Sequence, residues 1–354
     1  MELKNWYRHS FIFIVGAYFL ILGLIEAQVF FAPLATAIIL SLVMLPLANK
    51  LEKIVKKRSW ISLFCTFLLF LISLFFIGLI LYQIQIFIED WPKLKENLVP
   101  KWEELKSFLT ENTPLKESDL SSVESGKGLN SLTKGTTSSN ISGMLGQAFS
   151  FLGNYLLTFI YVFFLLNYRK DFKIFLLKIF SEEKRSEVNA VINESITIAP
   201  RYLAGKATMI AILAGLYAIG LGISGVENFI LISILAALFS IIPYIGNIIG
   251  FALAVALGFA ASGETGILIG IALTFGIAQF VESYILEPFI VGDKVDLHPF
   301  FVILVVIIGN LIWGVIGMIL CIPILAIVVV ILLHIPNLKP LGELLAGNKG
   351  KEKS

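Results

Sequence analysis

The sequence predicts an all-α polytopic membrane protein with about eight transmembrane segments. Hydrophobic residues make up 57% of the chain and the mean hydropathy is +0.89. Charged residues make up only 15%, against roughly 25% in soluble domains. Several apolar runs exceed the ~18 residues that indicate a membrane span. Two of these runs, in the C-terminal half, are long and interrupted, which indicates broken or re-entrant helices.

The residues that carry most enzyme chemistry are sparse. Cys65 and Cys321 lie inside apolar runs with no His or Cys partner at ligand spacing, and the three His residues are far apart. We found neither a Walker loop nor a nucleophile elbow. We therefore expect no catalytic residue, no metal and no cofactor. A secondary transporter fits this chain better than an enzyme or an ATP-driven pump.

The N-terminal part, residues 1–88, is expected to be a three-helix membrane unit. Its spans are predicted at 11–25, 29–48 and 60–88, with the first retained rather than removed as a signal peptide. Five of the ten residues at 49–58 are basic and one is acidic. The positive-inside rule places this connection in the cytoplasm, and Lys4 and Arg8 place the N-terminus there too. A basic segment between two spans does not indicate a nucleic-acid partner.

Residues 89–142 are expected outside the cytoplasm. Apolar residues first recur every three to four positions, which predicts an amphipathic helix, and Pro92 and Pro100 should kink or interrupt it. Residues 113–142 are rich in Ser, Thr, Gly and Asn, a composition typical of a flexible loop. A fourth span within residues 143–168 then returns the chain to the cytoplasmic side.

Residues 169–206 are predicted to form a cytoplasmic amphipathic segment. We expect two cytoplasmic or interfacial helices here, at 172–180 and 182–199, with Pro200 separating the second helix from residues 201–206. A fifth span, at about 208–223, then runs outward. It opens a C-terminal transport region at 207–335, to which a cytoplasmic tail at 336–354 is attached.

Two runs in the transport region, 229–261 and 300–335, do not match a single span. The first has 33 residues, or about 50 Å as one helix, whereas a bilayer core is about 30 Å thick. Each run is either a broken, tilted span or a hairpin of two half-helices. The C-terminus is cytoplasmic in both arrangements, but residues 287–299 lie outside in the first and inside in the second.

Polar residues within this apolar region are candidates for binding, because membrane helices avoid them unless they face protein or water. A break at 243–247 would free backbone groups for a solute, although a packing kink is the alternative. Three polar residues then share one helical face at spacing i, i+3, i+4. The predicted solute- or ion-binding residues are Pro243, Tyr244, Gly246, Asn247, Gln279, Glu282 and Ser283.

The charged segment after this polar face is a candidate gate. Its alternative is ordinary: solvated charges in a loop, and a His-Pro pair that starts the next helix. The predicted gating residues are Glu287, Pro288, Gly292, Asp293, His298 and Pro299.

The order of several short motifs resembles a known family. The chain carries Arg-Tyr-Leu-x-Gly at 201–205, Ile-Pro-Tyr-Ile-Gly at 242–246, Glu-Pro-x-x-x-Gly at 287–292, Leu-His-Pro at 297–299 and Gly-x-x-Gly at 314–317, with Pro323 after them. In this order, within such a hydropathy profile, they resemble the autoinducer-2 exporter (AI-2E) family of PerM-like permeases. The resemblance covers about residues 5–340. One departure is Lys206, where many relatives would have Gln, and we interpret this lysine as an interfacial anchor.

The resemblance implies eight spans, a homo-oligomer that could be a pentamer, and a place in the bacterial plasma membrane. It also implies small-solute export. The family includes proteins described as sodium(lithium)/proton antiporters and others tied to sporulation. This gives three hypotheses. The first is a secondary transporter that exports a small polar solute, such as an autoinducer-2-like molecule of quorum sensing. The second is a Na+(Li+)/H+ antiporter, and the third is a membrane scaffold without transport. The expected partners are lipid and a small solute, or a monovalent cation and a proton.

Overall fold

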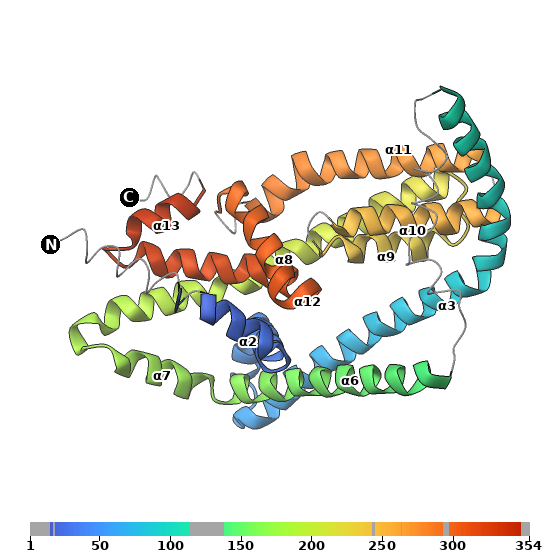
Figure 1. The fold of residues 1–354 in the computed structure, drawn as a ribbon. Coiled ribbons are helices and arrows are strands. Elements are labelled where there is room, and N and C mark those ends of the chain that lie inside the picture. The colour runs from blue at the N-terminus through green and yellow to red at the C-terminus, as the bar shows by residue number, and fades with distance from the viewer. Residues whose placement is uncertain are drawn as a thin grey trace.

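The computed structural model describes residues 15–16, 18–112, 138–242, 245–262, 264–292 and 297–347, and these form a helical protein (Figure 1). Residues 18–26 are helical. The later elements are α2 (Gln28–Leu51), α3 (Arg58–Asn112), α6 (Ser138–Asn167), α7 (Arg169–Ile179), η1 (Glu182–Lys184), α8 (Arg185–Ile223), α9 (Phe229–Phe239), α10 (Ile245–Ser262), α11 (Thr265–Val281), η2 (Glu282–Gly292), α12 (Pro299–Leu333) and α13 (Lys339–Leu345).

The apolar helices confirm a multi-pass membrane protein. Among the described residues, five helices are long and apolar enough to cross a membrane, or six if residues 151–167 and α7 count as one bent span. The exact number of eight spans is therefore not confirmed. In the N-terminal part, α2, α3 and α6 pack on one another through small and aliphatic side chains. This cluster comprises Ala37, Ala48, Ile61, Cys65, Val162 and Leu166.

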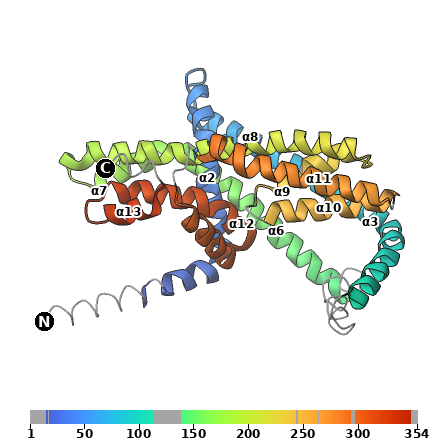
Figure 2. The same cartoon turned by 90° about the horizontal axis from the view of Figure 1, so that it is seen from above.

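Helices α3 and α8 continue through prolines, although proline lacks the backbone N–H that a helix interior needs. Helix α3 runs 55 residues through Pro92 and Pro100, and its second half turns away from the first (Figures 1 and 2). Helix α8 runs 39 residues through Pro200, so the predicted separation at that position is wrong. Ala199 and Tyr202, on either side of this proline, are buried. Packing on both sides holds the helical path despite the missing backbone hydrogen bond.

The predicted polar loop at 113–142 is shorter than expected at its C-terminal end, because α6 already begins at Ser138. Most of that loop, residues 113–137, lies outside the described residues. At its other end α6 stops at Asn167. The chain then bends by 68° into α7, which corresponds to the amphipathic helix predicted at 172–180.

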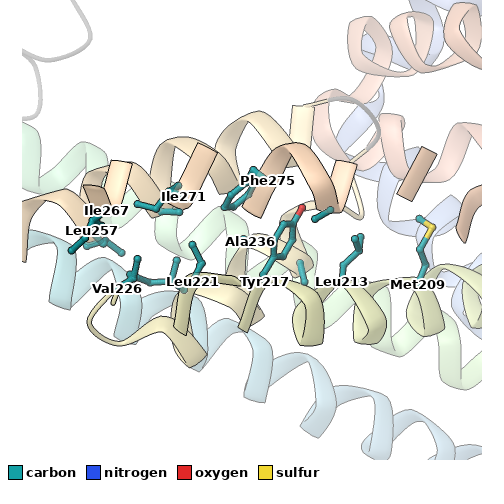
Figure 3. Close-up of a cluster of buried hydrophobic side chains, with 14 of the residues drawn as sticks. Met209, Leu213, Tyr217, Leu221, Val226, Ala236, Leu257, Ile267, Ile271 and Phe275 are labelled. Atoms are coloured by element: carbon teal, nitrogen blue, oxygen red, sulfur yellow. The ribbon is translucent and has the colours of Figure 1, made fainter. Parts of the chain in front are cut away.

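Helix α8 organises the C-terminal half. Its buried positions Met209, Leu213, Tyr217 and Leu221 recur every four residues, so they form one stripe along the helix. Figure 3 shows this stripe facing side chains from α11, among them Ile271 and Phe275. The Tyr217 ring stacks on Phe275 with 4.5 Å between centroids. The stripe therefore fixes the α9–α11 group to the C-terminal half of α8.

The apolar run at 229–261 is a hairpin of two half-helices. Helices α9 and α10 lie side by side (Figures 1 and 2). A Cβ at Gly246 would overlap the Phe239 carbonyl, and one at Gly250 would press on Ala236. Only glycine lets the two backbones approach this closely. The first of the two predicted arrangements, one broken span, does not describe this run.

The run at 300–335 also folds back. The backbone of α12 leaves helical geometry at Trp313 and Gly314, and a Cβ at Gly309 or Gly317 would overlap the backbone of the other. A straight helix of 35 residues would be about 52 Å long. Yet the His298 amide donates to the Leu345 carbonyl at 2.9 Å. The residue before α12 and the last residue of α13 thus lie together.

The two hairpins open in opposite directions along α8. The start of α9 and the end of α10 lie near the C-terminal end of α8, where Gly222 faces Phe229 and Gly258 faces Val226. The end of α12 lies near the N-terminal half, where His334 Nε2 is 3.9 Å from Glu194 Oε2. The hairpins meet between these points, because Ile242 packs with Val306 of α12. Figures 1 and 2 show the same division of the elements.

Candidate functional site

A network of polar side chains runs from the interior to the exposed side chain of Gln279, where α8, α10, α11 and η2 converge. Lys206 Nζ of α8 lies 3.7 Å from Glu282 Oε1 of η2. Asn247 Nδ2 of α10 donates to Glu282 Oε2 at 2.6 Å and also to Gln279 Oε1 of α11. Gln279 Nε2 donates in turn to Ser283 Oγ at 2.9 Å. Five side chains from four elements thus form one connected set.

The local backbone explains why these side chains converge. Asn247 stands in the first turn of α10, directly after the reversal that separates this helix from α9. Gln279 and Ser283 are four residues apart and so share a helix face. The α-helical pattern changes to a π-helix at Glu282. Short stretches of π-helix are frequent at functional sites, and this one begins at the carboxylate at the centre of the network.

The two charged groups of the network are nearly enclosed by protein. The side chains of Lys206 and Glu282 retain 11% and 9% of their exposure. Taking both charges out of water is costly, and the ion pair and the amide of Asn247 offset part of that cost. Glu287, on the next part of η2, is exposed but close enough to interact electrostatically with both.

One acceptor in the network remains unused. With Asn247 Nδ2 donating to two oxygens, its Oδ1 is buried and has no hydrogen-bond partner among the described residues. An unsatisfied buried polar atom costs about 1–3 kcal/mol, and such atoms in native proteins call for an explanation. A hydroxyl or N–H group of a bound molecule would satisfy this oxygen.

The predicted binding residues divide into three groups. Asn247, Gln279, Glu282 and Ser283 come together in the polar network. Gly246 precedes Asn247, and what the structure shows of it is the close backbone approach to Phe239. Pro243 and Tyr244 lie outside the described residues. Whether any of these residues binds a solute stays a prediction.

The predicted gating residues do not form a single cluster in the described chain. Glu287, Pro288 and Gly292 belong to η2, next to the network, and Asp293 lies outside the described residues. His298 and Pro299 begin α12. His298 Nδ1 accepts from the Phe300 amide at 3.3 Å, so this residue caps the helix. This hydrogen bond favours the alternative of a helix start, and a gating role stays a prediction.

Sequence reasoning missed the role of Lys206. Its interpretation as an interfacial anchor is wrong, because the ammonium group points into the network rather than toward a surface. A signal was present in the sequence. Between residues 207 and 286 the only charged residues are Glu227, Glu264 and Glu282. A carboxylate inside an apolar helix needs a cation, and Lys206 is the nearest basic residue before that stretch.

Comparisons with known proteins agree with this architecture. The family model of the AI-2E family transporter matches residues 10–337. The chain is 30% identical over 203 residues to "Putative transport protein YueF" of Bacillus subtilis, covering 56% of this chain and 54% of YueF. It is 29% identical over 133 residues to "Putative transport protein YrrI" of the same organism, covering 38% and 37%.

A third relative is "Putative transport protein MT0215" of Mycobacterium tuberculosis, 28% identical over 173 residues, covering 48% of this chain and 46% of the relative. The chain thus spans about half or less of the length of these curated relatives. The family model, by contrast, extends over nearly the whole sequence. The chain belongs to the AI-2E transporter family and is a multi-pass membrane protein.

Proposed function

We propose that this protein is a secondary transporter that exports a small, uncharged, hydroxylated solute bound at the network of Lys206, Asn247, Gln279, Glu282 and Ser283. An autoinducer-2-like sugar derivative has this chemistry. The observation that carries the proposal is the buried, unpartnered Oδ1 of Asn247. It lies within a polar set at the meeting point of two hairpins.

The charges of the network favour an uncharged cargo. A site for a free cation needs an excess of negative charge or open oxygen ligands. Here the ammonium of Lys206 already lies beside Glu282. An uncharged polyol would need no further compensation, because hydroxyl groups both donate to and accept from the amides and the carboxylate.

The oppositely opening hairpins support alternating access. Half-helices that meet inside the membrane and are related by opposite orientation are a recurring design of secondary transporters. The tip of the α9–α10 hairpin carries Asn247, and the neighbouring Ile242 packs on α12. A small shift of the α9–α10 tip against α12 would therefore open the network toward one face and close it toward the other.

Flux through purified protein tests the proposal. The full chain is reconstituted in proteoliposomes, and counterflow of a radiolabelled autoinducer-2-like sugar derivative is measured with no ion gradient. We expect saturable counterflow that Asn247→Leu lowers at least about tenfold. Two further variants each neutralise one carboxylate. Glu282→Gln does so inside the network, and Glu227→Gln is its control at an exposed span end. Glu227→Gln should leave flux unchanged.

The outcomes separate the three hypotheses. No counterflow of any hydroxylated solute would sink the exporter proposal. Sodium-driven proton movement that Glu282→Gln removes would establish the antiporter instead. Absence of both activities, with protein partners retained after loss of the polar network, would favour a scaffold. Homo-oligomer formation stays a prediction and is read from the mass of the detergent-solubilised protein.

A further inference from the structure

Two connections distant in sequence are joined at one end of the membrane helices. Glu52 lies against three cations: Arg58 at 3.0 Å, Arg169 at 2.8 Å and Lys170 at 3.7 Å. Ser59 Oγ also donates to Asn167 at 3.1 Å. The α2–α3 connection and the α6–α7 connection are therefore held together at a single place.

This junction carries a large excess of positive charge. Residues 49–58 and 168–180 together contain nine basic and two acidic residues. Glu52 compensates one of the three cations around it, and residues 53–57, including Lys53, Lys56 and Lys57, are exposed. We call Lys53, Lys56, Lys57, Arg58, Arg169 and Lys170 the basic patch. Such a concentration of cations attracts a surface of opposite charge.

Helix α7 leaves the basic patch with an uncovered apolar side. None of its residues is buried. Phe172, Phe175, Leu176 and Ile179 are spaced as i, i+3, i+4 and i+7, which is one helix face, and they are between 42% and 62% exposed. Lys173, on another side of the helix, donates to Asn193 of α8 at 2.9 Å. The apolar face is therefore turned away from the protein.

The position of α7 identifies the environment of that face. The helix comes after the α6 span and Tyr168 and is bent 68° from that span, and its 11 residues extend only about 16 Å. It is too short to cross a bilayer, and it departs at a steep angle to a span. The exposed rings of Trp60 and Tyr168 stand at the same junction, as aromatic residues do where a membrane meets water.

We propose that the basic patch binds the headgroups of anionic phospholipids and that α7 lies in the membrane surface, with Phe172, Phe175, Leu176 and Ile179 among the acyl chains. A basic amphipathic helix held flat at the end of a span is the geometry of an interfacial helix. Each lysine near an anionic membrane surface adds its own contribution to the attraction. The exposed lysines of the basic patch should therefore make the protein prefer anionic over zwitterionic lipids.

Quenching by labelled lipid tests the placement of α7. The full chain with Cys65→Ala and Cys321→Ala carries a single bimane label at Phe175→Cys, or at Glu182→Cys as a control whose side chain is 87% exposed. In nanodiscs with lipids doxylated near the headgroup, the label at position 175 should be quenched and the control should not. Equal quenching at both positions, or quenching at neither, overturns the placement. So does crosslinking between copies through Phe175→Cys.

Native mass spectrometry tests the choice of lipid. Protein equilibrated with equimolar phosphatidylglycerol and phosphatidylcholine should retain the anionic lipid. The triple variant Lys53→Gln, Lys56→Gln, Lys57→Gln should reduce that retention at least about tenfold. The matched control, Lys93→Gln, Lys95→Gln, Lys101→Gln on α3, should not. Equal binding of the two lipids, or equal loss in both triple variants, overturns the proposal whatever the transport assay shows.

Discussion

Lys206 Nζ and Glu282 Oε1 lie 3.7 Å apart between α8 and η2, and each side chain is about nine-tenths enclosed. Within the described residues this is the ion pair with the least exposed partners. It joins the long helix that organises the C-terminal half to the π-helix that begins at the network. Breaking this ion pair should change both the stability of the protein and its transport activity. The two effects can be measured separately, as unfolding temperature and as counterflow.

Removing one partner should be worse than removing both. Lys206→Gln or Glu282→Gln alone leaves an enclosed charge uncompensated, which costs about 3–5 kcal/mol for a buried pair. We expect each single variant to lower the apparent unfolding temperature of the solubilised protein in fluorescence-detected size-exclusion chromatography, and the double variant to recover most of the loss. A double variant as unstable as the sum of the singles would contradict the pairing.

Asn247→Leu should lower activity strongly while the protein still folds, with a loss of stability from the hydrogen bond that Glu282 no longer accepts. The substitution deletes the hydrogen bonds to Gln279 and Glu282 and the unpartnered oxygen, but leaves the ion pair in place. We expect counterflow to fall at least tenfold, an effect of about 1.4 kcal/mol or more on the flux barrier. The elution profile should stay monodisperse. Retention of full flux would show that the network does not contact the cargo.

The fold-back of α12 predicts that alanine is not tolerated at Gly317. Gly317→Ala would place a methyl group into the Gly309 backbone, whereas Gly276→Ala on α11 meets open space. The first should lower the yield of folded protein sharply, because neither backbone can yield without opening the hairpin. The second should be neutral or stabilise by up to about 1 kcal/mol, since alanine favours helix over glycine. Similar outcomes for the two variants would argue against the hairpin.

The sidedness of the hairpins is measurable by cysteine labelling in the background without native cysteines. His298→Cys and Lys339→Cys should react with a membrane-impermeant maleimide from one and the same face, because the start of α12 lies beside Leu345. Glu227→Cys, at the far end of α8, should react from the opposite face. Labelling of His298→Cys from the face of Glu227→Cys would restore the broken-span arrangement.

Much of this architecture is predictable from composition and spacing. Gln279, Glu282 and Ser283 could be grouped from the sequence because a single helical face relates them, and Asn247 because it comes after a proline break. The family could be identified because its motifs keep their order, and the family model confirms it. These are local or ordered features, which a sequence displays directly.

Features that depend on distant contacts could not be predicted in the same way. A broken span and a hairpin of the same sequence have the same length and hydropathy. Only contacts within the fold, such as that of Gly309 with Gly317, distinguish the two arrangements. The path through Pro200 is set by the burial of its neighbours, which overrides the local preference of proline. Lys206 was misassigned because its partner comes from an element far along the chain, and only the tertiary fold shows that it is enclosed.

The junction of Leu297 with Ala346, an antiparallel bridge beside the His298–Leu345 hydrogen bond, has a mechanical consequence. The segment from Leu297 to Ala346 begins and ends at the same place, because its two ends are paired. Such a closed segment can rotate or slide as one body without stretching the backbone on either side. The part of α12 around Val306 can thus shift against Ile242 while the Leu297–Ala346 bridge stays closed.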